Sequence, residues 1–584
     1  VFVPVSFLSG ITGQLYRQFT ITIAVSVLLS TVVALTLSPV MCSLILKPDS
    51  GKKKNIVFRK INEWLNLGNH KYVAVINRVI RNPRRLMSAF GLVLVAIFII
   101  HRLVPTSFLP VEDQGYFKIE LELPEGATLE RTRVVTDRAV QYLEKNPYVA
   151  YVQNVTGSSP RVGSNQARSE LTVILKPWEE RKGISIDKIM ENVEKDLKEY
   201  PECKVYLSTP PVIPGLGTSG GFEMQLEARG EATFDNLVQA ADTLMYYAQK
   251  HKELTGLSSS LQSEIPQLYF DVDRDKVKML GVPLADVFST MKAYTGSVYV
   301  NDFNMFNRIY KVYIQAEAPY REHKDNINLF FVKAKDGVMV PLTSLGNASY
   351  TTGPGSIKRF NMFTTAVIRG SAAQGYSSGQ AMEIMEQIAR NHLPDNIGLE
   401  WSGLSYQEKK AGGQTGLVLT LVFLFVFLFL AAQYESWTVP IAVLLSLPVA
   451  ALGAYLGVVI CGLENDIYFQ IGLVMLVGLA AKNAILIVEF AKVQVDKGGD
   501  LIQSAIHAAQ LRFRPILMTS LAFVLGMLPM VLASGPGSAS RQAIGTGVFF
   551  GMIFAIVFGI VLVPFFFVLV YKTKAKVQHK IKKD

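Results

Sequence analysis

The sequence predicts a polytopic α-helical membrane protein that carries a large external α+β region. Apolar runs of membrane-spanning length lie towards both ends of the chain, and a long polar block at residues 105–415 separates them. Half of the 584 residues are hydrophobic and 18% are charged, which is too apolar for an ordinary soluble protein and too charged for an all-membrane one. Similar short motifs near the two ends of the chain also predict a parallel internal repeat, of which the first copy is mostly missing.

Seven apolar runs are the predicted membrane spans. They occupy residues 21–46, 87–104, 416–432, 439–461, 469–490, 515–532 and 544–571, and residues 1–8 look like the end of an earlier span. Lysine and arginine crowd the linker at 47–86 and the tail at 573–584, so the positive-inside rule places both in the cytoplasm. The polar block then lies outside, and the net charge of +11 reflects orientation in the membrane rather than nucleic-acid binding.

The repeat links the start of the chain to its end. Four landmarks recur at a nearly constant offset: Pro4 with Pro529, Gly10 with Gly535, Arg17 with Arg541, and Pro39 with Pro564. Matching spans run in the same direction, so the two copies would be related by an axis along the membrane normal. We therefore expect residues 1–46 to be the end of a first copy and roughly 450 further residues to precede Val1. Chance similarity between apolar segments is the alternative.

The first part of the external region, residues 105–208, predicts one ferredoxin-like subdomain. Strand patterns alternate with amphipathic helix patterns in the order β-α-β-β-α-β, which defines that unit. The elements are expected at residues 116–123, 128–144, 148–155, 169–175, 186–199 and 204–208.

A second subdomain of the same kind is expected to be split. Its first half lies in residues 209–260 and its closing half in residues 356–412, with strands or helices at 221–228, 234–251, 356–370, 377–391 and 398–401. The intervening residues 261–355, rich in short strands and turns, form an inserted lobe farther from the membrane. Residues 413–572 then supply five transmembrane helices.

Lys482 is the most informative single residue, because it lies well inside an apolar span. An ammonium group there costs several kcal/mol unless it is paired or deprotonated. In the predicted spans no carboxylate lies near mid-membrane, since Glu489 is two turns closer to the cytoplasm and Asp466 lies at the outer edge. We expect the partners in the missing first copy, where carboxylates that load and release protons would exchange ion pairs with Lys482. A static salt bridge is the alternative.

The following span adds two candidates. Arg512 lies at its cytoplasmic end, where arginine is also expected simply for orientation. Thr519, a little over one turn inside the span, can relay a proton or hydrogen-bond Lys482, but threonine in membrane helices more often bonds its own backbone.

Four strings resemble one known family closely. These are GLAAKNAILIVEF at 478–490, RPILMTSLAF at 514–523, YESW at 434–437 and YVNDF at 299–303, and they look like the hydrophobe/amphiphile efflux branch of resistance-nodulation-division permeases. The likeness runs from Val1 to about Tyr571. It implies a Gram-negative inner-membrane proton/drug antiporter, not an enzyme, that needs no cofactor or metal and exports hydrophobic or amphiphilic compounds. It also implies a homotrimer working with a periplasmic adaptor protein and an outer-membrane channel.

The resemblance assigns roles to several residues. The lysine matching Lys482 pairs with two aspartates of the first half of the family's chain, and the positions matching Asn483, Arg512 and Thr519 belong to the same relay. Those aspartates have no counterpart here, so this chain alone is not expected to couple protons to transport. By the same resemblance the two ferredoxin-like units are porter subdomains and the inserted lobe is a docking domain.

The resemblance also implies a drug pocket between porter subdomains, beside a glycine-rich loop at residues 157–163. Its candidate lining residues are Gln153, Gly157, Ser158, Ser159, Pro160, Arg161, Tyr206, Phe222 and Met224. The loop lacks the phenylalanines usual in the family, which we expect to change substrate preference, because buried apolar area stabilises apolar ligands. For the loop, Tyr206 and Phe222, a plain surface turn or ordinary strand packing is an equally good interpretation.

Three alternatives stay open at this point. A metal-ion exporter of the same superfamily would need methionine or carboxylate stations along its path, whereas the seventeen methionines are scattered. A non-transporting receptor or scaffold is disfavoured, because it would have no use for Lys482 in the membrane, where a charged side chain is costly in free energy. An inactive fragment would have the same domains and no activity. The sequence has no phosphate loop, metal-ligand cluster or nucleophile-base pattern, which disfavours an enzyme.

Overall fold

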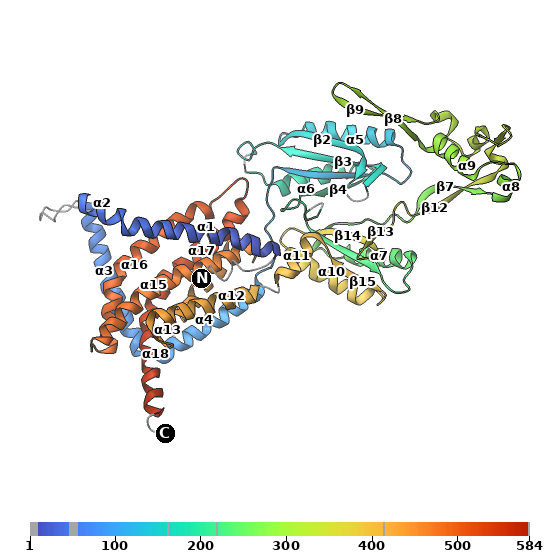
Figure 1. The fold of residues 1–584 in the computed structure, drawn as a ribbon. Helices are drawn as coiled ribbons and strands as arrows, with labels where there is room; N and C mark the ends of the chain where they lie inside the picture. The colour runs from blue at the N-terminus through green and yellow to red at the C-terminus, as the bar shows by residue number, and fades with distance from the viewer. Residues whose placement is uncertain are drawn as a thin grey trace.

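The computed structural model describes residues 10–45, 56–159, 163–181, 183–217, 220–412 and 415–581. A bundle of long helices forms one end of the molecule, and an α+β region extends from it, so the predicted division into a membrane part and a large α+β region is confirmed (Figure 1). The predicted span end at residues 1–8, the repeat landmark Pro4 and the basic residues at 52–54 lie outside the described residues.

Within the described residues, seven helical segments are long and apolar enough to cross a membrane. They are built from α1 (Gly10–Leu35) with α2 (Leu37–Ile45), α4 (Pro83–Leu103), α12 (Thr415–Tyr434), α13 (Val439–Leu444) with α14 (Leu447–Cys461), α15 (Ile467–Asp496), α16 (Leu501–Val531), and α17 (Ser538–Phe554) with α18 (Ile560–Ile581). Several helices extend beyond the apolar runs that predicted them. For example, Asp500 caps α16 by accepting from the backbone of Gln503 at 3.0 Å, so the helix starts 14 residues before Pro515.

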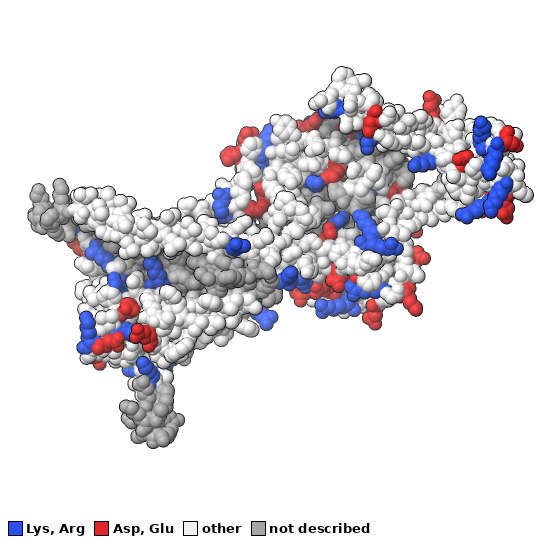
Figure 2. Space-filling model, in the orientation of Figure 1, with Lys and Arg blue, Asp and Glu red and all other residues white. Residues whose placement is uncertain are grey.

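The centre of the bundle is formed by α14, α15, α17 and α18, whose facing side chains make one hydrophobic core. Small residues allow this close approach: a Cβ added at Gly453 would lie 2.6 Å from the Cβ of Phe554. By contrast, the side chains of α1 and α2 from Ile21 to Ile45 are almost all exposed. Figure 2 shows a largely uncharged band across the bundle, with charged residues gathered at the end away from the α+β region. Such a band is expected of a membrane-spanning surface.

At that charged end α3 (Ile56–Arg81) runs across the bundle (Figure 1). Its inner face packs on α16 and α18, where the Tyr72 hydroxyl donates to the carbonyl of Ile560 at 2.9 Å and the Tyr72 ring stacks on Phe513. Its outer face exposes Trp64, a residue enriched at membrane interfaces. This helix connects the first span to the second.

The first α+β unit contains β1 (Tyr116–Glu122), α5 (Leu129–Glu144), β2 (Val149–Ser159), β3 (Gly163–Leu175), α6 (Ile186–Leu197) and β4 (Lys204–Ser208). The antiparallel sheet has the order β2-β3-β1-β4. Alternate residues of β1 explain its two faces, since Phe117, Ile119 and Leu121 are buried against the helices. The residues between them, Lys118 and Glu120, point to the opposite, polar face.

The second unit contains β5 (Phe222–Ala228), α7 (Phe234–Ala248), β6 (Leu254–Ser259), β13 (Lys358–Phe360), β14 (Phe363–Ala372), α10 (Ser378–His392) and β15 (Ile397–Trp401). Its sheet has the order β13-β14-β5-β15, with β6 also paired to β14. Sequence analysis missed β6, because its sequence LTGLSS has no clear alternation. α11 (Gly403–Gly412) follows and leads back to the bundle.

A third unit lies at the far end of the molecule (Figure 1). The antiparallel ribbon of β7 (Ile265–Val272) and β12 (Gly346–Gly353) connects it to the second unit. It contains α8 (Arg274–Met279), α9 (Leu284–Met291), the hairpin of β8 (Val298–Met305) and β9 (Arg308–Ile314), and the short pair β10 (Phe331–Lys333) and β11 (Met339–Pro341). A small core of its own, including Val287 and Leu342, makes it a separate lobe.

Candidate functional site

Lys482 lies near the middle of α15, a helix of 30 residues. Its side chain is exposed on the surface of the bundle, while its neighbours Ala481 and Asn483 are buried. Among the described residues no salt bridge reaches its ammonium group. Glu489, the next acidic residue along α15, is seven residues away, or about 10 Å at the rise of an α-helix. In a membrane, an ammonium group at this position is costly unless it is paired or deprotonated.

A polar contact joins α15 to α16 beside this lysine. The Asn483 side-chain amide donates to the Ser520 hydroxyl at 3.0 Å, and both side chains are buried. Lys482 and Thr519 are the chain neighbours of the two residues in this contact. They therefore lie at nearly the same depth in the bundle. The exposed side chains of both leave this face of α15 and α16 open to another element.

Thr519 and Arg512 each have other partners in this structure. The Thr519 hydroxyl donates to the backbone carbonyls of Pro515 and Ile516, at 3.0 and 3.2 Å. Arg512 lies two turns earlier on α16, with its guanidinium 3.6 Å from the centre of the Phe490 ring. Its Nε is buried and has no hydrogen-bond partner among the described residues. Among the described residues, no hydrogen bond joins either side chain to Lys482.

A cleft separates the first α+β unit from the second. One wall is the polar face of the first sheet, with Lys118 and Glu120 of β1, Glu170 of β3, and Tyr206 of β4. The other wall comes from the second unit, with Ser258 of β6 and with Arg369 and Ser371 of β14. The cleft opens to solvent and has a cavity volume of about 50 Å³, well below the roughly 300–1,000 Å³ of sites that enclose a drug-sized molecule.

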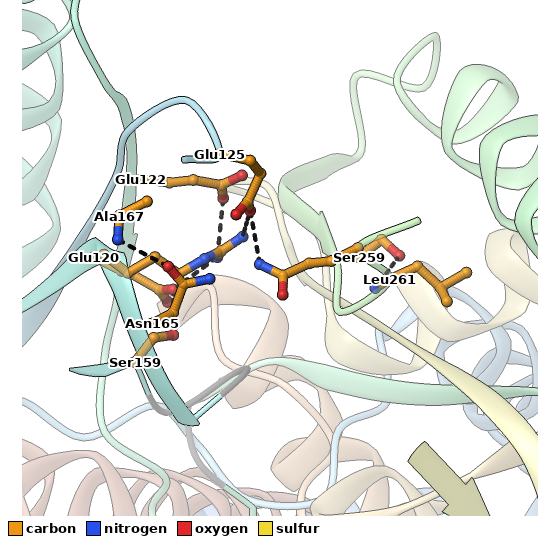
Figure 3. Close-up of polar contacts among 10 residues, drawn as sticks. Glu120, Glu122, Glu125, Ser159, Asn165, Ala167, Ser259 and Leu261 are labelled. Carbon is orange, nitrogen blue, oxygen red and sulfur yellow. Dashed lines mark hydrogen bonds and ion pairs between the residues drawn. The ribbon is translucent and has the colours of Figure 1, made fainter. Parts of the chain in front are cut away.

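A buried arginine supports the first wall of this cleft. Arg168 of β3 lies 3.1 Å from carboxylate oxygens of both Glu120 and Glu122, and 3.6 Å from Glu125 (Figure 3). Glu125 in turn accepts a hydrogen bond at 2.7 Å from Gln262, which follows β6 in the second unit. The network thus fixes the polar face of the first sheet and connects it to the second unit.

Comparison with known proteins identifies the family. Residues 1–571 match the sequence profile of the AcrB/AcrD/AcrF family. The chain belongs to this family. Its similar relatives include multidrug resistance protein MdtF of Escherichia coli K12, 39% identical over 577 residues, and the probable efflux pump membrane transporter TtgB of Pseudomonas putida, also 39% identical over 577 residues. Multidrug export protein AcrF of Escherichia coli K12 is 38% identical over 579 residues.

These alignments cover 98% of this chain but only 55 to 56% of each relative, so the chain spans about half the length of the curated relatives it matches. Membership of the AcrB/AcrD/AcrF family, together with the apolar helices, makes this chain an inner-membrane protein of the resistance-nodulation-division type. The predicted resemblance to that class of multidrug efflux permeases is confirmed.

The pocket residues predicted for this AcrB/AcrD/AcrF family member fall into three groups. Tyr206 lines the cleft. Phe222 and Met224 are buried in the core of the second unit, so their side chains do not line the cleft. Gln153, Gly157, Ser158 and Ser159 belong to β2, and the ladder continues to Ser159 opposite Gly163, so most of the predicted glycine-rich loop is a strand hairpin. Pro160 and Arg161 lie outside the described residues.

Sequence analysis missed Ser520 and the charged residues of the cleft. Ser520 gives no signal by itself, because serine in membrane helices usually bonds its own backbone. The signal for the cleft was the alternation of charged and apolar residues in KIELE at 118–122 and RSELTV at 168–173. Such alternation indicates a strand with one polar face, but it does not tell what that face contacts.

Two buried carboxyls lie where the α+β region joins the bundle. Burial raises the pKa of Glu408, on α11, to about 7, and also raises the pKa of Asp466, which caps α15, to about 7. The Glu408 carboxylate accepts from the Ser378 hydroxyl at 2.7 Å. Asp466 accepts from the backbone of Phe469, also at 2.7 Å. Both groups therefore gain or lose a proton near neutral pH.

The Asn483 and Ser520 contact gives a first testable prediction. Replacing Ser520 with alanine leaves the buried Asn483 amide without this partner, which should destabilise the packing of α15 on α16 by about 0.5–2 kcal/mol. The loss should appear as a lower thermal unfolding temperature of the detergent-solubilised protein. Ser43→Ala is the matched control, because the exposed Ser43 hydroxyl donates to the carbonyl of Val40, on its own helix. Equal unfolding temperatures for both variants would contradict the prediction.

Proposed function

We propose that this chain is part of a proton/drug antiporter, the inner-membrane subunit of a tripartite efflux system that exports hydrophobic or amphiphilic compounds. The observation that carries the proposal is Lys482, an exposed ammonium group in the middle of a membrane-spanning helix without a partner among the described residues. A site of this kind is costly in hydrocarbon and is typically part of an ion or proton pathway. MdtF, AcrF and TtgB are named for multidrug resistance, multidrug export and efflux.

The proposed coupling works through the open face of α15 and α16. Carboxylates supplied from outside the described residues would pair with Lys482 when ionised and release it when protonated. Each proton that binds would then change how one group of helices packs against another. A local change of charge can drive a large rearrangement in this way. Asn483 and Ser520 would hold α15 and α16 together during this change, and Arg512 and Thr519 would contribute to the same relay.

The α+β units would provide the path for the exported compound. In this proposal the first and second units are porter subdomains of the ferredoxin-like type, and their relative movement opens and closes the cleft between them. The far lobe at residues 261–355 would be the docking domain. A homotrimer, a periplasmic adaptor protein and an outer-membrane channel would complete the pump, and the apolar surface of α1 and α2 would face the bilayer or another part of the assembly.

The test is dye and drug efflux in a Gram-negative host that lacks its own major pumps. Expression of the full-length gene should lower the accumulation of an uncharged amphiphilic dye and raise resistance to amphiphilic drugs. A protonophore should remove the effect, because the proton gradient is the energy source. Unchanged accumulation with and without the gene, at a confirmed level of membrane-inserted protein, would overturn the proposal.

A further inference from the structure

The helix α3, which runs across the charged end of the bundle, has two contrasting sides (Figure 1). On the packed side Leu65, Tyr72 and Ile76 are buried, and Tyr72 contacts both α16 and α18. The other side is exposed along the length of the helix. A helix that crosses the ends of membrane spans lies along the membrane surface, so its exposed side can meet lipid headgroups.

Five exposed residues form one stripe along α3. Their positions follow one another at intervals of four, seven, four and three residues, so they lie on one side of the helix over about five turns. In chain order they are Lys60, Trp64, Lys71, Val75 and Arg78. We call this set the α3 stripe. It combines three cations with two apolar side chains, of which Trp64 is 63% exposed.

The cations of the α3 stripe have no acidic partner in the described part of the chain. No salt bridge among the described residues reaches Lys60, Lys71 or Arg78. The one acidic residue of α3, Glu63, pairs instead with Arg59 at 3.7 Å. The three positive charges are therefore open to an anionic group.

The composition of the α3 stripe fits a phospholipid. Tryptophan is amphipathic and prefers the membrane interface, while lysine and arginine place an apolar stem against lipid and a charge among the headgroups. A soluble phosphate would satisfy the cations but would leave Trp64 and Val75 in water. Orientation in the membrane requires only that basic residues lie on the cytoplasmic side, not that they share one side of a helix with a tryptophan.

We propose that the α3 stripe is a binding site for anionic phospholipid. Its three cations contact the headgroup phosphates, and Trp64 and Val75 contact the upper part of the acyl chains. This inference goes beyond the proposed function and does not depend on it, because it needs only the membrane location of the chain.

The experiment measures lipid contact at Trp64 by fluorescence quenching. Purified full-length protein is placed in phosphatidylcholine vesicles that contain increasing amounts of brominated phosphatidylglycerol, and a parallel series contains brominated phosphatidylcholine. Bromine quenches tryptophan at contact, and the Trp64 signal is the difference between each protein and its Trp64→Phe counterpart. The ratio of quenching in the two series gives the preference of the site for the anionic lipid.

Two variants test the charges of the α3 stripe. The first, Lys60→Gln with Lys71→Gln and Arg78→Gln, should lower the preference for the anionic lipid by at least about tenfold, because each basic residue at a membrane surface contributes about fivefold. The second, Lys60→Arg with Lys71→Arg and Arg78→Lys, keeps the charges and should stay within about twofold of wild type. Quenching by brominated phosphatidylcholine should be unchanged in both, which shows that α3 stays at the membrane surface.

The matched control removes the same number of cations from the same end of the bundle. It is Lys497→Gln with Lys572→Gln and Lys574→Gln, at the end of α15 and in α18, and it should keep the wild-type preference. The inference is overturned if wild-type protein shows no preference for the anionic lipid, if the glutamine variant of the α3 stripe keeps it, or if the control loses it equally. Displacement of the brominated lipid by soluble glycerol phosphate would also overturn it, because the site would then bind phosphate rather than lipid.

Discussion

Replacing Lys482 with alanine should abolish proton-driven export while leaving the protein folded in the membrane. The variant removes the ammonium group that the described residues leave without a partner, so any carboxylate that pairs with it would lose its counter-ion. Protonation of that carboxylate would then make or break no ion pair, so efflux should fall to the level of cells without the gene. The measurement is dye efflux from energised cells, at equal amounts of membrane-inserted protein.

Lys492→Ala is the matched control for this prediction. Lys492 lies ten residues farther along the same helix, where it pairs with Asp496 at 3.3 Å near the charged end of the bundle. A partly exposed i,i+4 pair near the end of a helix contributes about 1 kcal/mol or less to stability, so efflux should stay near the wild-type rate. If Lys482→Ala exports as well as Lys492→Ala, then Lys482 has a structural role and the proposed coupling is wrong.

Replacing Arg168 with leucine should have the largest effect on the stability of the α+β region. The Arg168 side chain is 4% exposed and lies among Glu120, Glu122 and Glu125 (Figure 3). Without it these carboxylates repel one another at a mostly buried site, which should destabilise the first unit by about 3–5 kcal/mol. Hydrogen exchange of the full chain should show faster exchange in β1 and β3, while α14 and α15 keep their wild-type protection.

Two further measurements sharpen the Arg168 prediction. Mild acid should restore part of the protection in Arg168→Leu, because protonation neutralises carboxylates that have lost their counter-ion. Arg133→Leu serves as the control, since Arg133 pairs with Glu130 on the exposed surface of α5, where water screens the pair and its loss should leave β1 and β3 protected. If the amides of β1 and β3 exchange as slowly in Arg168→Leu as in the wild-type protein, then the Arg168 network does not stabilise the sheet.

The bundle was predictable because membrane spans are long, continuous signals. Each span is one uninterrupted apolar run, so neither pairing partners nor register need be known. The helix ends were not predictable in this way. Asp500 begins α16 well outside the apolar run, and only its capping position indicates the start.

The strands depended on pairing that sequence does not specify. β6 is short and polar, and it is ordered by β14, a strand more than 100 residues away along the chain. The family resemblance implied a loop at Gly157, Ser158 and Ser159, yet the hairpin ladder includes these residues. In β6, contacts with a strand distant in the sequence outweighed local preference.

The sequence singled out Lys482 because this one residue violates a strong rule, and it did not indicate the cleft, whose residues act as a group. Lys482 stands out because charge in a span is rare. The family resemblance implied that Phe222 and Met224 line a pocket, but with Leu226 they form the alternating buried face of β5. The charged cleft depends on two units meeting, and no local pattern indicates which strand faces meet.

The most direct test of the proposed coupling is transport by the purified full-length protein in lipid vesicles. An imposed pH gradient should drive movement of an amphiphilic dye across the membrane in exchange for protons that move in the opposite direction, and Lys482→Ala vesicles should show neither flux. Dye movement that is independent of the pH gradient, or equal in wild-type and Lys482→Ala vesicles, would contradict a proton-driven mechanism centred on Lys482.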